Sequence, residues 1–79
     1  MVFMTKGTCA SKIDIEVEQN TVKGVRFHGG CDGNAKGIAK LVTGMSVSDV
    51  ISRLEGITCG RKPTSCPDQL SQALRQLES

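Results

Sequence analysis

The four cysteines are the side chains of this 79-residue chain that are best suited to chemistry: Cys9, Cys31, Cys59 and Cys66. A thiolate binds soft metal ions and attacks disulfides. No two of these cysteines form a C-x-x-C pair, so their spacing matches neither a zinc ribbon nor a thioredoxin-like motif. The expected positions of the cysteines in the fold therefore say more about their function than their spacing does.

Cys66 is predicted to lie at the start of a helix. Pro67 follows it, and proline is favoured in the first helical turn because its missing N–H is not needed there. Ser65 and Asp68 have the spacing of a capping box, with Asp in place of the usual Glu or Gln. Unpaired N–H groups and the helix dipole favour a thiolate at this position. We expect Asp68 to be a charge of the first turn and no catalytic base.

The first half of the chain predicts an antiparallel β-hairpin over residues 12–28. Residues 12–18 alternate strictly between apolar and charged side chains, as in a strand with one buried face. Gln19 and Asn20 supply a short turn, and Gly24 breaks the alternation of the return strand, which predicts a bulge. The apolar residues 1–5 are expected to add a short edge strand.

Three helices are predicted to follow, over residues 34–43, 46–55 and 67–78. Each has apolar residues at helical spacing on one face, and Gly44 and Gly56 end the first two. Packing these apolar faces on one side of a small sheet of two to three strands is the simplest way to bury them. The chain is therefore predicted to form a single α+β domain over residues 1–79.

This fold is expected to bring the four cysteines together. Cys9 precedes the hairpin and Cys31 follows it, so both lie at the same end of the hairpin. Cys59 and Cys66 flank a short loop, and docking the last helix beside that end would gather all four. Four thiolates suit zinc, and the same set suits an iron–sulfur cluster.

Several alternatives to a four-cysteine metal site remain open at this point. Cys59 and Cys66 could instead form a redox pair that reduces a partner, and all four thiols could be inert or form structural disulfides. His28 is expected to face solvent on its strand, where it could replace a cysteine as a ligand. The helices could also pair with a partner protein or with a second copy of the chain, which would make the protein an interaction module without a metal.

The composition excludes several classes of protein. The 10 basic residues face 8 acidic ones, and the only aromatic residues are two phenylalanines, so a nucleic-acid-binding surface is not expected. No apolar run is long enough for a transmembrane helix or a signal peptide, so we expect no membrane partner and a cytoplasmic location. A core this small often needs a bound metal or a partner subunit, and the partner could be a second copy of the chain in a homodimer.

The run 64–68 reads Thr-Ser-Cys-Pro-Asp and resembles the signature of the TSCPD domain family. Residues 6–9, 29–34, 44–45 and 59–60 are also similar to the short stand-alone members. Such domains otherwise form the C-terminus of ribonucleotide reductases, particularly cobalamin-dependent ones. The resemblance implies a link to deoxyribonucleotide synthesis and an oxidoreductase name. The chain is too short for a reductase barrel, so the implied role is to assist, regulate or reduce a reductase.

A second, weaker similarity is to iron–sulfur scaffold proteins of the IscU and NifU type. Cys9, Cys31 and Cys66 fall where those scaffolds have cysteines, and the turn 44–45 looks like their inter-helix turn. This similarity implies a shared fold and metal site. In those scaffolds the first cysteine is followed by Gly and then Asp. Here Cys9 is followed by Ala10 and Ser11, so the Asp is absent.

Overall fold

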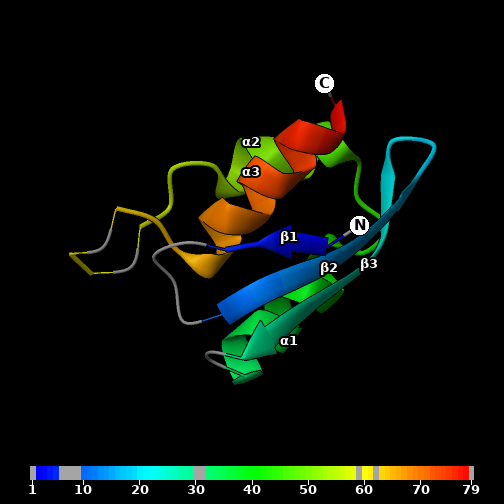
Figure 1. The fold of residues 1–79 in the computed structure, drawn as a ribbon. Helices are drawn as coiled ribbons and strands as arrows, with labels where there is room; N and C mark the ends of the chain where they lie inside the picture. The colour runs from blue at the N-terminus through cyan, green and yellow to red at the C-terminus, as the bar shows by residue number, and fades with distance from the viewer. Residues whose placement is uncertain (1, 6–9, 30–31, 59, 62, 79) are drawn as a thin grey trace.

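The chain folds as an α+β domain, as predicted. The computed structural model describes residues 2–5, 10–29, 32–58, 60–61 and 63–78. In this part of the chain a three-stranded antiparallel sheet, in the order β1-β2-β3, packs with three helices (Figure 1). The elements are β1 (Val2–Met4), β2 (Ala10–Glu18), β3 (Thr21–Gly29), α1 (Asp32–Val42), α2 (Val47–Leu54) and α3 (Cys66–Glu78).

The predicted hairpin is confirmed as β2 and β3. Its turn is formed by Gln19 and Asn20, whose φ angles are both positive, at 53° and 61°. Two successive left-handed residues match the right-handed twist of the flanking strands. The register shifts between Glu16 and Val17, opposite the segment that contains Gly24, so the predicted bulge is also present.

The two edges of the sheet are formed by β1 and β3. Strand β1 pairs with β2, which confirms the short edge strand expected at the N-terminus. At the start of β3, the N–H of Val22 donates to the carbonyl oxygen of Met45 at 2.9 Å, and its own carbonyl accepts from the N–H of Gly44 at 2.8 Å. The connection between α1 and α2 therefore closes this part of the β3 edge.

The helices begin and end within two residues of the predicted bounds. Ser46 caps α2, because its Oγ accepts a hydrogen bond from the backbone N–H of Asp49 at 3.2 Å. Gly44 and Gly56 follow α1 and α2 with φ angles of 92° and 87°. Residues that have a Cβ rarely adopt this backbone conformation. No helix in the described ranges is long and apolar enough to cross a membrane.

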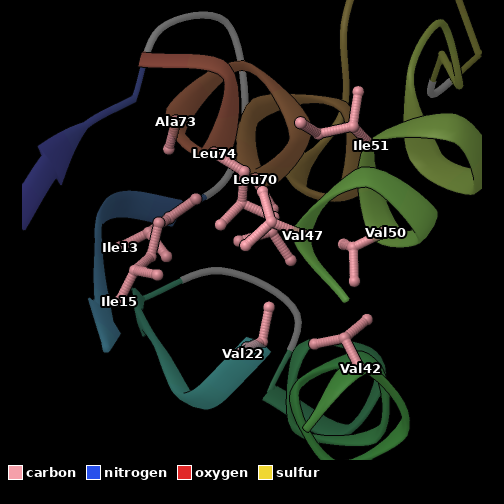
Figure 2. Packing of buried hydrophobic residues seen from close by; sticks show 10 residues of the cluster. All are labelled: Ile13, Ile15, Val22, Val42, Val47, Val50, Ile51, Leu70, Ala73 and Leu74. Atoms are coloured by element: carbon pink, nitrogen blue, oxygen red, sulfur yellow. The ribbon is translucent and has the colours of Figure 1, made fainter. Parts of the chain in front are cut away.

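The core lies between one face of the sheet and all three helices (Figure 2). Inward side chains of β2 and β3 meet side chains from α1, α2 and α3 in one cluster, so the helices share a face of the sheet, as predicted. Its buried members are Ile13, Ile15, Val22, Val42, Val47, Val50, Ile51, Leu70, Ala73 and Leu74.

An ion pair on the surface also joins α3 to the residue after α2. Nε and Nη2 of Arg75 lie 2.9 and 2.6 Å from the two carboxylate oxygens of Glu55. The hydrogen bond from Arg75 lowers the pKa of Glu55 from its ordinary value. Both side chains are about half exposed, so we expect this pair to orient the helices more than to stabilise them.

Candidate functional site

Cys66 is the first residue of α3, as its position before Pro67 predicted. The residue is half-buried and its thiol is free. In this turn Pro67 has no N–H, and Ser65 accepts hydrogen bonds from the backbone N–H groups of Asp68 and Gln69. The local structure therefore places a partly accessible sulfur at the N-terminus of α3.

The other three cysteines, Cys9, Cys31 and Cys59, lie outside the described residues. The gathering of the four thiols therefore stays a prediction. One premise of it is confirmed, because Ala10 at the start of β2 pairs with Gly29 at the end of β3. The first residue of β2 and the last residue of β3 therefore lie side by side. Within the described ranges, no group of three or more His, Cys, Asp or Glu residues could hold a metal ion.

The residues on both sides of Cys66 in the sequence belong to a buried hydrogen-bond network. The Oγ of Ser65 accepts from the backbone N–H of Asp68 at 3.2 Å, which is the helix cap that the spacing predicted. The same hydroxyl donates to the carbonyl oxygen of Ile57 at 2.6 Å. Ser65 therefore joins the start of α3 to the segment that follows α2.

The carboxylate of Asp68 is a charge of the first turn of α3, as predicted, and it also has partners that the sequence did not indicate. Asp68 is only 7% exposed, and it does not return a hydrogen bond to the N–H of Ser65 as a full capping box would. Its Oδ1 accepts from the N–H of Gly56 at 2.8 Å. Its Oδ2 accepts from the hydroxyl of Thr64 at 2.5 Å and from the amide of Gln72 at 2.9 Å.

These contacts determine the charge state of Asp68. Burial alone would raise the pKa of the Asp68 carboxyl, since a low-dielectric environment disfavours the charged form. The hydrogen bonds from Thr64, the Gly56 N–H and Gln72 together outweigh burial and hold the pKa below its ordinary value of 3.8. Asp68 is therefore a buried carboxylate whose charge is stabilised by three donors.

Sequence reasoning missed the partners of this carboxylate. Gln72 donates to Asp68 from one turn further along α3, and Gln69 donates to the Oγ1 of Thr64 at 3.0 Å. The spacing of Asp68 and Gln72 by four residues on one helix was a usable signal. Gly56 lies 12 residues earlier in the chain, and no local pattern connects it to Asp68.

His28 lies on the face of the sheet opposite the core, as predicted. Its Nε2 is 2.9 Å from Oδ2 of Asp14 on the neighbouring strand, and its side chain is one-third exposed. The hydrogen bond from His28 lowers the pKa of Asp14. The alternation of β2 and β3 could have revealed this pair, since both residues lie on the polar face of the hairpin.

The donor set of the chain fits a soft metal ion in its chemistry. Four thiols are the ligands that zinc and iron–sulfur clusters use most often. In the described part of the chain only Cys66 offers such a donor, and it does so from a helix N-terminus. The chemistry of the residues thus agrees with a metal, while the full ligand geometry stays a prediction.

Fold and site together define a small α+β domain that presents a cysteine at the start of its last helix. The chain belongs to the TSCPD domain family, whose model matches residues 1–78. Searches among curated proteins and among solved structures find no match. The likeness to iron–sulfur scaffolds is therefore a resemblance in sequence that no solved structure supports.

Proposed function

We propose that this protein is a cysteine-rich metal-binding domain that assists ribonucleotide reduction without catalysing it alone. The observation that carries the proposal is the free, half-buried thiol of Cys66 at the N-terminus of α3, inside the motif that defines the family. Ionised sulfur is the form of a cysteine that binds zinc or an iron–sulfur cluster.

The proposed ligands are the thiolates of Cys9, Cys31, Cys59 and Cys66. A bound zinc ion or iron–sulfur cluster would supply strong cross-links between segments that are far apart in the sequence. Such cross-links matter in a chain of 79 residues, because its apolar core is small. The residues of the chain itself would bind the metal, orient it and hold it near the surface.

The link to ribonucleotide reductase rests on the family. TSCPD domains otherwise form the C-terminus of ribonucleotide reductases, so a reductase or another redox protein is the partner that we propose. The described residues form a three-stranded sheet with three helices and no barrel, which supports an accessory role for this domain.

The test is the metal and thiol content of protein purified without chelator. We expect about one zinc per chain, or iron together with sulfide, by elemental analysis. Replacing any of the four cysteines singly with Ser should lower both metal content and stability, because metal binding and folding are coupled. Ser48→Ala, an exposed substitution on α2, is the control that should change neither.

Other results would contradict the metal proposal. Full metal content in all four Cys→Ser variants would place the ligands elsewhere. Two thiols missing from a denatured thiol count, with no metal, would favour the redox alternative, in which Cys59 and Cys66 form a reversible disulfide. Four reactive thiols without metal would favour a reduced redox protein or a domain that acts through partner binding.

A further inference from the structure

The polar residues of the family motif are buried, whereas its cysteine is not. Thr64, Ser65 and Asp68 are 7%, 5% and 7% exposed, while Cys66 between them is only half-buried. Every buried side-chain N or O atom in the described residues has a hydrogen-bond partner. The polar residues of the motif are therefore occupied by internal contacts and do not face a ligand.

These contacts reach backward to the segment that follows α2. Ser65 donates to the carbonyl of Ile57, and Asp68 accepts from the N–H of Gly56. Thr64 completes the arrangement by donating to the same carboxylate. We call Thr64, Ser65 and Asp68, with their bonds to Gly56 and Ile57, the clasp. It ties Gly56 and Ile57, which follow α2, to the residues that begin α3.

The described residues of the segment 56–63 are not buried, so hydrogen bonds are what restrain this part of the chain. All described residues from Gly56 to Pro63 are exposed: Gly56, Ile57, Thr58, Gly60, Arg61 and Pro63. A segment without buried apolar contacts opens at low free-energy cost unless hydrogen bonds restrain it. Burial resumes at Thr64, where the clasp begins.

We infer that Thr64, Ser65 and Asp68 are positioning residues that hold the thiol of Cys66 in a fixed place for its ligand. Cys66 lies directly after Ser65 and two residues before Asp68, so bonds on both sides restrain its backbone. Restraining a donor before binding lowers the entropy that binding would otherwise cost. For the metal as ligand, this inference rests on the proposed function.

The experiment removes clasp hydroxyls from the full chain and compares the variants with a matched control. Thr64→Val keeps the shape of the side chain but removes its hydroxyl, and Ser65→Ala removes the bond to Ile57. Ser71→Ala is the control, because its fully buried hydroxyl donates to the carbonyl of Asp68 at 2.6 Å within α3 and makes no bond to the loop. Thr64→Ser should rescue, since it keeps the hydroxyl.

The first readout is the accessibility of Cys66, which does not depend on metal binding. Reduced, metal-free protein is pulsed with iodoacetamide, and the Cys66 peptide is quantified by mass spectrometry. We expect Thr64→Val and Ser65→Ala to be alkylated at Cys66 at least about 5-fold faster than Ser71→Ala, at a temperature where circular dichroism shows all of them folded. Rates equal to that of the Ser71→Ala control would overturn the inference.

The second readout is zinc affinity, measured by competition with a chromophoric chelator. We expect affinity to fall about 10-fold or more in the clasp variants and to be kept in Ser71→Ala and Thr64→Ser. If the unmodified protein binds no zinc or iron, the proposed function fails while the alkylation rates still decide the positioning role. Faster alkylation with unchanged zinc affinity would overturn the connection between the clasp and the metal.

Discussion

At the scale of single residues, burial separates two aspartates that local sequence treats alike. Asp49 and Asp68 each stand three residues after a serine, and each serine accepts a hydrogen bond from the N–H of its aspartate. Asp49 is exposed, whereas Asp68 is buried and accepts bonds from Thr64, Gly56 and Gln72. The capping geometry is thus shared, but only Asp68 connects the two helices.

This difference predicts a specific dependence of stability on pH. The folded pKa of Asp68 is lowered, so its stabilising effect is present above the ordinary value of 3.8 and is lost as pH falls through the lower, folded value. Asp68→Asn should cost about 1–3 kcal/mol at pH 7, because it disturbs buried hydrogen bonds. It should also reduce the loss of stability on acidification.

Urea unfolding between pH 7 and pH 2.5 measures this effect. Asp49→Asn is the matched control, because it makes the same change in the exposed member of the pair. Asp14 and Glu55 keep titrating in every variant, so their contribution is common to all curves. Identical pH profiles for Asp68→Asn and the unmodified protein would contradict the role assigned to this carboxylate.

At the scale of elements, the alternation of side chains in β2 specifies the hairpin clearly, whereas the backbone conformation of its turn is unfavourable for one of the two turn residues. Gln19 and Asn20 both adopt positive φ, yet glycine and asparagine tolerate that conformation better than glutamine does. The strict alternation of β2 compensates, because only one register places Ile13 and Ile15 in the core. The strands therefore impose a left-handed conformation on Gln19, which does not favour it.

Replacing the turn by its preferred sequence should stabilise the domain. The double substitution Gln19→Asn with Asn20→Gly should raise stability by about 1 kcal/mol, since the left-handed conformation is then less costly. Thermal unfolding followed by circular dichroism measures the gain. Gln19→Val, a β-branched residue at the same position, should lower the melting temperature; a rise with Gln19→Val would contradict the assigned turn geometry.

At the scale of the whole molecule, the small core limits the stability of the domain. Ten buried apolar residues in the described part of the chain connect the sheet to all three helices. A domain of this length is expected to be stable by about 4–12 kcal/mol. One large defect in this cluster could therefore remove much of the total.

Leu74→Ala provides such a defect. Leu74 is fully buried in α3, and its truncation should cost about 2–5 kcal/mol through lost burial and a cavity. Leu77→Ala, three residues later and 42% exposed, should cost much less. If the four cysteines bind zinc, adding zinc should restore part of the lost stability of Leu74→Ala, because binding to the folded state alone shifts the equilibrium. Guanidinium unfolding with and without zinc measures both effects, and equal costs at the two positions would contradict the assigned core.

The sequence by itself determined the elements and the place of Cys66. Period-two alternation, helical spacing, glycine stops and Pro67 are local signals, and each acts through the backbone of a few neighbouring residues. They predicted the hairpin, the three helices and a cysteine at the start of α3. The Thr64–Asp68 run similarly identified the TSCPD family.

Only the tertiary structure decided what the polar residues around Cys66 do. Ser46 and Asp49 repeat the spacing of Ser65 and Asp68, so no local rule could show that one aspartate is exposed and the other buried. Burial depends on α2 and α3 packing together, which brings Gly56 to Asp68 across 12 positions of sequence. That contact makes Asp68 part of a clasp, because a hydrogen bond between distant segments exists only after the chain has folded.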